Sequence, residues 1–302
     1  MDSRRGLAYG AAAYVLWGVF PLYFPLLEPG GAVEILAHRI VWSAVTMGLL
    51  IVLLRRGSRL LGTWRDRRTL LFLGVAALAI SVNWGVYIYG VNNGRVVEAS
   101  LGYFINPLVT VLMGVFILGE RLRRLQWAAM GIAAVAVVVL TVNYGRPPWV
   151  AIALALSFGT YGLAKKKAGA GPLESLTIET MLIAPLAALY IGWLTADGGS
   201  NFGAHGVGHA LLLMSTGIVT AIPLVLFGAA AIRISMTAIG LLQYLAPILQ
   251  FLVGVVILHE DMPLGRWIGF ALVWVALVVF TAEALTHHRR RQLRLGAEAA
   301  AL

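Results

Sequence analysis

The chain alternates long apolar stretches with short polar connections, most of which are basic. Ten apolar stretches can be separated, at residues 7–27, 33–54, 69–91, 97–118, 126–143, 147–164, 175–195, 209–230, 236–258 and 266–285. Most reach the roughly 17–25 residues that a helix needs to cross a bilayer. They lack the in–out alternation of a membrane barrel, and open loops or sheet edges are not stable in lipid. We therefore predict an all-α membrane protein with ten transmembrane helices.

Composition supports this interpretation. Hydrophobic residues make up 60% of the 302 positions and charged residues 12%, against about a quarter charged in soluble domains. A soluble core of this length cannot hide so much apolar surface, so the excess must face lipid. The first stretch follows Arg4 and Arg5, as a signal peptide would, but Pro21 and Pro25 interrupt it and no small-residue cleavage site follows. We expect it to be retained as the first span.

The basic residues predict the orientation of the chain. With ten spans and a cytoplasmic N-terminus, nineteen of the twenty-three Lys and Arg residues fall in cytoplasmic segments. Only Arg95, Arg146 and Arg266 fall outside, and Arg39 lies within a span. Cytoplasmic loops of inner-membrane proteins carry such an excess of positive charge. We expect a multi-pass protein of the inner (plasma) membrane with both termini in the cytoplasm.

An internal repeat occurs at an offset of 140 residues. The segment 101–120 aligns with 241–260, and the register continues into the next helix. The matched pairs are Leu101/Leu241, Pro107/Pro247, Leu112/Leu252, Gly114/Gly254, Val115/Val255, Ile117/Ile257, Leu118/Leu258, Glu120/Glu260 and Trp127/Trp267. Because five helices is an odd number, the second copy is inverted, an arrangement typical of transporters with a midplane site. The predicted units are 1–144 (five helices), 147–285 (the inverted five) and a basic cytoplasmic tail, 286–302.

Several of these stretches resemble a known family. They are Glu34–Ser43, Asn83-Trp84, Val91–Asn93, Glu98–Leu108, Gly119–Arg121, Arg124–Trp127, Ile178–Met181 and Gln243-Tyr244. Together they are similar to the EamA-type branch of the drug/metabolite transporter superfamily, and within it to the RarD-like proteins of bacteria. The resemblance implies ten helices in two inverted five-helix repeats and a permease, but it carries no secure substrate. One departure is His259 before Glu260, where such proteins more often have Gly, as Gly119 before Glu120 here.

Charged side chains inside the spans are candidates for a site. An Arg at a helix centre costs about 2.5–3.5 kcal/mol on insertion scales, so such groups usually face a partner or a wet cavity. His38 and Arg39 lie in the second stretch, with Glu34 on the same helix face as His38, and Glu179 lies at a similar depth in the seventh. We predict that His38 and Arg39 bind an anionic or polar part of a substrate, and that His38 or Glu179 takes up a proton. The alternatives are a structural ion pair or snorkelling. Inversion places Arg39 and Glu179 toward opposite faces, which disfavours a direct pair between them.

Uncharged polar residues add to the predicted site. They are Asn83, Trp84 and Tyr87 in the third stretch, Tyr103 and Asn106 before Pro107, and Gln243 and Tyr244 before Pro247. Proline frees a backbone carbonyl one turn upstream, and paired prolines beside polar side chains point to broken helices along a substrate path. We predict substrate-binding residues at these positions and hinges at the two prolines. The alternative is helix packing by hydrogen bonds of about 0.6 kcal/mol each.

The absence of several catalytic and phosphate-binding motifs limits the classes of function that the sequence supports. The chain has no Cys, no H-E-x-x-H, no G-x-S-x-G and no phosphate-binding loop. We predict no enzyme activity, no cofactor and no metal, and a secondary transporter (permease) for a small polar or amphipathic metabolite or drug. The alternatives are an intramembrane enzyme without the usual motifs, or a channel.

The remaining predictions concern partners. The net charge of +10 reflects the basic cytoplasmic segments, so we expect a small-molecule substrate and the lipid bilayer as partners, and no nucleic acid. Stretches 126–143 and 266–285 are nearly free of polar residues and should face lipid. The spacing Gly265-x-x-x-Gly269 is a possible dimer face, so a monomer or weak homodimer is expected. The basic run from His287 to Arg291 should contact anionic lipid.

Overall fold

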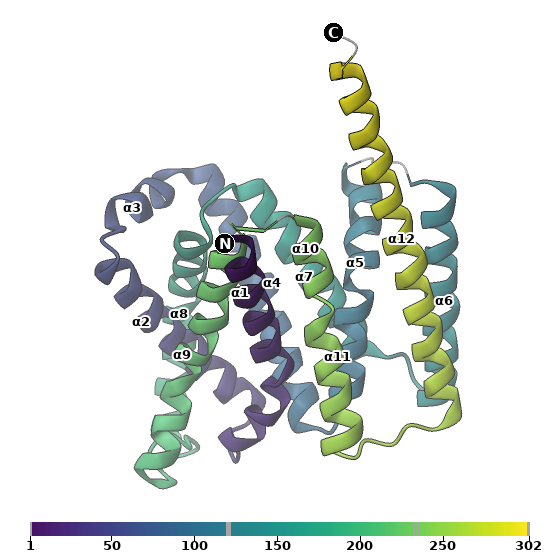
Figure 1. Ribbon diagram of the computed structural model, residues 1–302. Coiled ribbons are helices and arrows are strands. Elements are labelled where there is room, and N and C mark those ends of the chain that lie inside the picture. The colour runs from purple at the N-terminus through teal and green to yellow at the C-terminus, as the bar shows by residue number, and fades with distance from the viewer. Residues whose placement is uncertain (1, 119–121, 232, 235, 301–302) are drawn as a thin grey trace.

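The computed structural model describes residues 2–118, 122–231, 233–234 and 236–300, and every regular element in them is helical. The helices are α1 (Asp2–Gly18), α2 (Ala32–Leu53), α3 (Gly57–Arg65), α4 (Arg67–Asn92), α5 (Val96–Leu118), α6 (Arg124–Tyr144), α7 (Trp149–Ala168), α8 (Pro172–Ala196), α9 (Gly206–Ala231), α10 (Met236–Leu242), α11 (Leu245–Leu252) and α12 (Leu264–Ala300) (Figure 1). The prediction of an all-α chain is confirmed for this part of the protein.

Seven of the described helices are long and apolar enough to cross a membrane. They are α2, α4, α5, α6, α8, α9 and α12. The other three predicted spans correspond to α1, which has 17 residues, to α7, which ends in three lysines, and to the α10–α11 segment. The chain is therefore a multi-pass membrane protein.

Two predicted helices are interrupted. The first ends at Gly18, and the stretch with Pro21 and Pro25 forms two short 3₁₀ turns, η1 (Phe20–Leu22) and η2 (Phe24–Leu27). Each turn carries its proline near its start, where the missing N–H costs nothing. The predicted span 236–258 is split into α10, α11 and a π-helical turn, η3 (Val253–Ile257). The short helix α3, with a basic and an apolar side, was not predicted.

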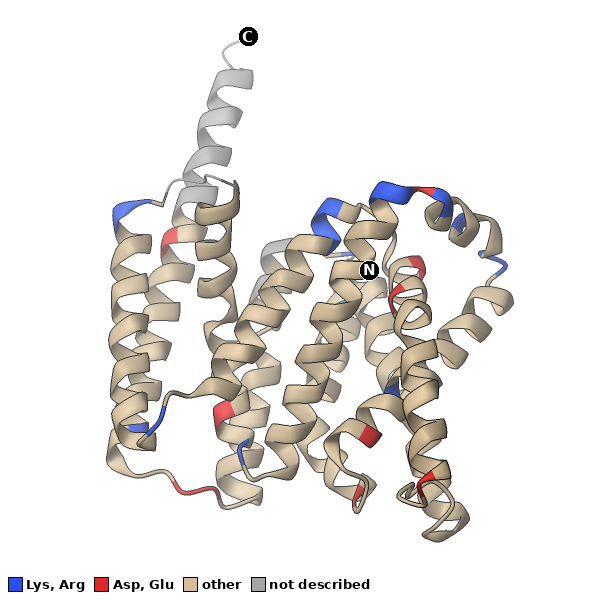
Figure 2. Cartoon of the chain, turned by 180° about the vertical axis from the view of Figure 1, so that it is seen from behind, with Lys and Arg blue, Asp and Glu red and all other residues tan. Residues whose placement is uncertain are grey.

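The two termini lie at the same end of the bundle (Figure 1). We call this the terminal end; it also holds α3 and the α7–α8 connection. The opposite, distal end holds the connections α1–α2, α4–α5, α6–α7, α8–α9 and α11–α12. Most of the described Lys and Arg residues gather at the terminal end (Figure 2). Because one end concentrates the positive charge, the geometry agrees with the charge pattern that predicted the orientation.

Several of the largest helix contacts have a counterpart when the two halves are exchanged. Exchange pairs α1 with α7, α2 with α8, α4 with α9, α5 with α11 and α6 with α12. The contact of α4 with α7 is matched by that of α9 with α1, and the contact of α2 with α9 by that of α8 with α4. The contacts α2–α8, α5–α11 and α6–α12 map onto themselves. Such a contact pattern is what an approximate twofold relation between the halves produces.

Helices α6 and α12 pack against each other at one side of the bundle (Figure 1). A Cβ added to Gly265 would collide with Asn143, and one added to Gly269 would collide with Leu140. The two glycines therefore serve close packing of α12 on α6 within the chain. The prediction that they form a dimer face is wrong, because that face is already covered.

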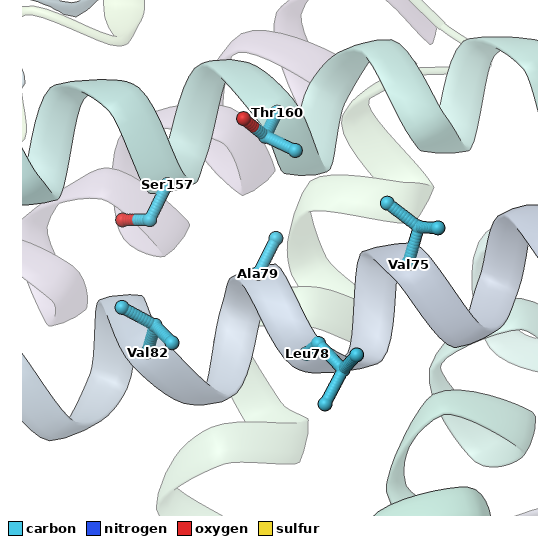
Figure 3. A pocket seen from close by; sticks show the side chains of 6 residues that line it. All are labelled: Val75, Leu78, Ala79, Val82, Ser157 and Thr160. Carbon is cyan, nitrogen blue, oxygen red and sulfur yellow. The ribbon is translucent and has the colours of Figure 1, made fainter.

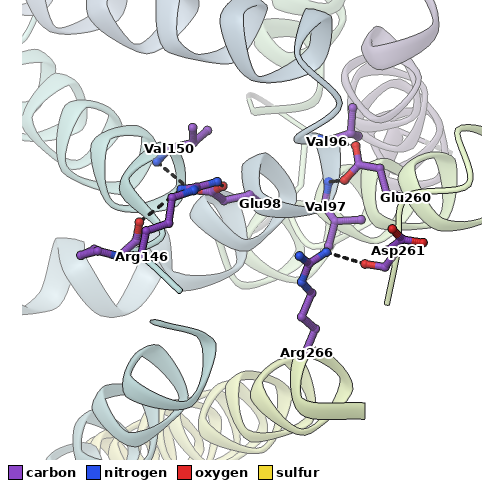
Figure 4. A network of polar contacts seen from close by, with 9 residues as sticks. Val96, Val97, Glu98, Arg146, Val150, Glu260, Asp261 and Arg266 are labelled. Carbon is purple, nitrogen blue, oxygen red and sulfur yellow. Dashed lines mark hydrogen bonds and ion pairs between the residues drawn. The ribbon is translucent and has the colours of Figure 1, made fainter. Parts of the chain in front are cut away.

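Two carboxylates tie helix starts together at the distal end (Figure 4). Glu98, in the first turn of α5, accepts from both terminal nitrogens of Arg146 (2.7 and 3.3 Å) and from the backbone N–H of Val150 at the start of α7 (3.0 Å). Glu260, after η3, accepts from the N–H groups of Val96 (2.5 Å) and Val97 (2.9 Å) at the start of α5. Free N–H groups at a helix start favour such negative charge. We call these contacts the distal clasp.

The ion pair of the distal clasp has no counterpart at the aligned positions of the other half. At the offset of 140 residues, Glu98 corresponds to Ala238, Arg146 to Gly6 and Val150 to Gly10. The counterpart of Glu260 is Glu120, which lies outside the described residues. At these aligned positions the described residues of the other half therefore cannot form an ion pair equivalent to that of Glu98 with Arg146.

Candidate functional site

Arg39 is the centre of a closed aromatic cage. It lies seven residues into α2, about 10 Å along the helix from the distal end, and is only 4% exposed. Its guanidinium carbon lies 4.1 Å from the ring centre of Trp84, 5.4 Å from that of Phe24 and 5.7 Å from that of Phe20. Its Nε donates to Thr220 Oγ1 at 3.0 Å. We call these five residues the Arg39 cage.

No acidic side chain in the described part of the chain neutralises Arg39. The four buried acids in this part of the chain have other partners. Glu34 accepts from Asn201 (2.7 Å), and Glu98 belongs to the distal clasp. Glu174 pairs with Arg56 (3.2 Å), and Glu179 pairs with Lys165 (3.1 Å). Taking a charge out of water costs several kcal/mol. A desolvated cation–π contact returns about 2 kcal/mol or more. The three rings therefore offset much of the cost of burying Arg39, but they supply no negative charge to neutralise it.

Asn83 connects the cage region to α7. Its amide nitrogen donates to the carbonyl of Leu154 (3.0 Å) and to Ser157 Oγ (3.1 Å), and its amide oxygen accepts from the Tyr103 hydroxyl (3.1 Å). The rings of Tyr103 and Tyr87 meet edge to face at 5.8 Å. The predicted residues Asn83, Tyr87 and Tyr103 are thus brought together between α4, α5 and α7.

Tyr87 has an unused hydroxyl. Its side chain is 3% exposed, its ring also contacts Phe24 of the Arg39 cage, and its hydroxyl has no hydrogen-bond partner among the described residues. A buried hydroxyl without a partner is costly and uncommon in a purely structural position.

His38 is separated from Arg39. Its ring stacks on Phe202 at 4.9 Å, and Trp42, one turn further along α2, also faces Phe202. Neighbouring residues on a helix point about 100° apart, so one faces the α8–α9 connection and the other the cage. The structure therefore does not bring the predicted site residues His38 and Arg39 together, and their roles in binding stay predictions. The prediction that Glu34 and His38 share a face is confirmed, since both meet that connection.

Glu179 forms a second, separate polar group. It is 1% exposed, and its Oε1 lies 3.1 Å from the Nζ of Lys165, which also donates to the Tyr161 hydroxyl at 2.9 Å. Neither carboxylate oxygen has a well-aligned hydrogen bond; at 3.1 Å the contact with Lys165 is nonetheless an ion pair. Glu179 lies near the terminal end and Arg39 near the distal end, in agreement with the expectation that they do not pair.

The remaining predicted residues lie apart from the cage. Asn106 is half-buried and accepts from Thr110 (3.4 Å) within α5. Gln243 and Tyr244 occupy the break between α10 and α11, and the Tyr244 hydroxyl lies 3.4 Å from Thr281 of α12. Pro107 lies inside a continuous α5, whereas Pro247 follows the break by three residues.

Sequence reasoning missed several residues of the cage. Phe20 and Phe24 come from the proline-rich turns, and Thr220 comes from α9, where a lone Thr in an apolar run gives no signal. Gln250, 3% exposed, donates to the carbonyl of Trp17 (3.1 Å) and leaves its own oxygen without a partner in the described chain. The sequence feature that could have identified Gln250 is an amide side chain in an apolar segment, shortly after the predicted site residues Gln243 and Tyr244.

A groove of about 330 Å³ lies between α4 and α7 (Figure 3). It is lined by Val75, Leu78, Ala79, Val82, Ser157 and Thr160. Leu78, Val82 and Val75 are among the exposed hydrophobic residues, so the groove opens toward lipid. It touches the Asn83 network only through Ser157, and we do not assign it as the site.

Comparison with known protein families shows which family this chain belongs to. The model of the EamA-like transporter family matches residues 4–142 and again 147–282. A helical, multi-pass chain with this match is a membrane transport protein by class. The chain belongs to the EamA-like transporter family.

Individual relatives show which members of this family the chain resembles. The chain is 57% identical over 298 residues to the protein RarD of Streptomyces exfoliatus, covering 99% of this chain and 95% of that one. It is 43% identical to the uncharacterized transporter YojE of Bacillus subtilis (strain 168), covering 93% and 94% of the two chains. A solved structure described as "Crystal structure of protein" matches with a TM-score of 0.60 at 22% identity, covering 93% of this chain and 98% of that one. This last likeness concerns the fold. The resemblance to the RarD-like proteins is confirmed.

Proposed function

We propose that this protein is a secondary transporter for a small polar or amphipathic compound. In this proposal ten spans form two inverted five-helix repeats in the inner membrane, with the terminal end in the cytoplasm. The Arg39 cage, with Tyr87 and the Asn83 network beside it, is the substrate site. The contact pattern that survives exchange of the halves supports the repeat.

The observation that carries the proposal is the buried charge of Arg39. A permanent cation deep in an apolar bundle is costly, and such residues in membrane proteins usually mark a substrate or ion pathway. Arg39 comes from the first half and its partner Thr220 from the second. The cage therefore lies where the halves meet, which is where inverted-repeat transporters bind their substrates.

Counterflow in proteoliposomes tests the proposal. Compounds that raise the melting temperature of the purified protein would be screened first, from metabolites and antibiotics. Vesicles loaded with an unlabelled hit should then transiently accumulate the labelled compound from outside. Arg39→Ala should abolish this overshoot. Arg95→Ala, at the same end but outside the cage, should keep it.

Other outcomes would contradict the proposal. Equilibration of the label without overshoot, for every compound that binds, would indicate a channel. Chemical conversion of the compound would indicate an enzyme. Normal counterflow by a folded Arg39→Ala variant would remove the cage as the site.

A further inference from the structure

Arg39 is a single positive charge, and its surroundings specify what could neutralise it. The other basic residues drawn into buried pairs are occupied: Lys165 by Glu179, Arg56 by Glu174 and Arg146 by Glu98. His38 faces the α8–α9 connection. One negative charge from a ligand would therefore make the cage neutral, and two would leave an excess that the buried surroundings disfavour.

The guanidinium is held in a way that leaves one edge available. Thr220 fixes Nε, and Trp84 lies over the guanidinium plane. The two terminal nitrogens make no hydrogen bond to any described residue of the chain. Their parallel N–H groups form a planar fork that matches the two oxygens of a carboxylate.

A second donor lies next to the cage. Tyr87 contacts Phe24 through its ring (5.8 Å), and its buried hydroxyl has no partner in the described chain. A phenol donates readily to an anion. The remaining walls of the cage, Phe20, Phe24 and Trp84, are aromatic and buried, so they suit an apolar or planar ligand body.

We propose that the Arg39 cage binds the carboxylate of a monoanionic substrate with an apolar body, held by the Arg39 fork and the Tyr87 hydroxyl. This inference rests on the proposed function and names its substrate class. Because Arg39 is almost fully enclosed, the ligand enters when the helices around the cage separate.

Binding of simple probes to the full-length protein in lipid nanodiscs tests this inference. Acetate, hexanoate and benzoate would be compared with benzamide, phthalate, sulfate and chloride by calorimetry and by melting temperature. Hexanoate and benzoate should bind more tightly than acetate, because only they carry an apolar body. Benzamide, which lacks the charge, and phthalate, which carries two, should bind at least tenfold more weakly than benzoate.

Variants of Arg39 and Tyr87 test whether benzoate binds at the cage. Arg39→Lys should weaken benzoate binding at least tenfold, because a fork becomes a point charge. The matched control Arg95→Lys should leave it unchanged. Tyr87→Phe removes only a hydroxyl that has no protein partner, so it should fold as well as the wild type and bind benzoate several-fold more weakly.

Three results would overturn the inference: no binding of any of the three monocarboxylates, equal affinity for benzoate and benzamide, or unchanged benzoate affinity in Tyr87→Phe. The last result remains decisive if Arg39→Lys does not fold. Counterflow of a neutral compound without carboxylate binding would remove the inference and keep the proposed transporter. Carboxylate binding at the cage without counterflow of any compound would contradict the proposed transporter and keep the carboxylate site.

Discussion

Arg39 and His38 illustrate how far single residues can be interpreted from sequence. Both were proposed as site residues because a charged or titratable side chain inside a membrane span is costly in free energy, and both are buried. Adjacent positions on a helix face different neighbours, however, so the two side chains end in different surroundings. The partners of Arg39 could not be predicted, because Phe20, Phe24 and Thr220 come from other elements. Sequence identifies a costly residue, whereas only packing identifies what surrounds it.

Asn83 gives a prediction at the scale of a single residue. Replacing it by Ala leaves the Tyr103 hydroxyl without a partner and removes the donor to Ser157, which keeps only its bond to the Leu154 carbonyl. The free energy of unfolding should therefore fall by about 1–3 kcal/mol. Tyr103→Phe removes one hydrogen bond and should cost about 0.6 kcal/mol. Unfolding in mixed micelles would measure both. Equal, negligible losses would show that the Asn83 hydrogen bonds are replaced by others.

At the scale of elements, the helical stretches were predictable but their interruptions were not. The length of an apolar stretch indicates the length of its helix, and it predicted the ends of α2 and α5 to within one residue. The break at Gln243-Tyr244 and the π turn η3 depend on packing against α1 and α5. Pro107 and Pro247 are equivalent in sequence, yet α5 runs through one and the chain breaks before the other. Aligned segments with an equivalent proline thus adopt different conformations in the two halves.

The capping of α5 by Glu260 predicts a pH effect. Burial raises the pKa of Glu260 above its ordinary value of 4.5, although the N–H groups of Val97 and Val96 lower it in part. A raised pKa in the folded state means that the contribution of this group to stability is complete below its unfolded pKa. That contribution is lost as the pH rises through the folded pKa.

The measurement is the melting temperature of the detergent-solubilised protein at several pH values above 4.5. Glu260→Gln, which cannot ionise, should show a flatter decline than the wild type over the range just above 4.5. Parallel curves for the two proteins would contradict the assignment of this titration to Glu260.

The paired prolines predict a dynamic effect. Replacing either by Ala restores a backbone donor and straightens the helix, so stability should hold or rise while turnover falls. If the halves exchange roles during transport, as the proposed inverted repeat requires, Pro107→Ala and Pro247→Ala should favour opposite conformations. Single cysteines at the symmetric positions Tyr103 and Gln243 can report this, since the chain has no native Cys. Wild-type labelling and full transport in both variants would reduce the prolines to packing features.

At the scale of the whole molecule, the repeat was visible in sequence because Pro, Gly, Glu and Trp recurred at one offset. In the structure, several of the largest helix contacts have a counterpart when the halves are exchanged. The asymmetry between halves was harder to predict. It depends on differences at single aligned positions, such as Ala238 in the second half where the first half has Glu98. Such differences do not contribute to the similarity by which a repeat is recognised.

The distribution of basic residues predicts the topology. A reporter that is active only in the cytoplasm should work when fused after Leu302, and one that is active only in the periplasm should not. The opposite pair of results would invalidate the orientation. Moving charge should matter as well: neutralising Arg55, Arg56 and Arg59 together should produce a minor population of misoriented protein.

The distal clasp has a consequence for how the transporter would work from its two sides. If alternating access separates the halves at one end and then the other, the ion pair of Glu98 with Arg146 holds only the distal end closed. At the terminal end the halves are joined by the contact of Arg56 with Glu174 at 3.2 Å, whereas Glu98 accepts three hydrogen bonds at the distal end. Because the distal contacts are the more extensive, the two conformations differ in free energy, and the one open toward the terminal end is more populated. Apparent affinity equals intrinsic affinity multiplied by the populated fraction. Substrate arriving from the cytoplasm should therefore bind more tightly than the same substrate arriving from outside, by tenfold for each 1.4 kcal/mol of clasp energy. Arg146→Gln should bring the two half-saturation concentrations together, as measured on oriented vesicles.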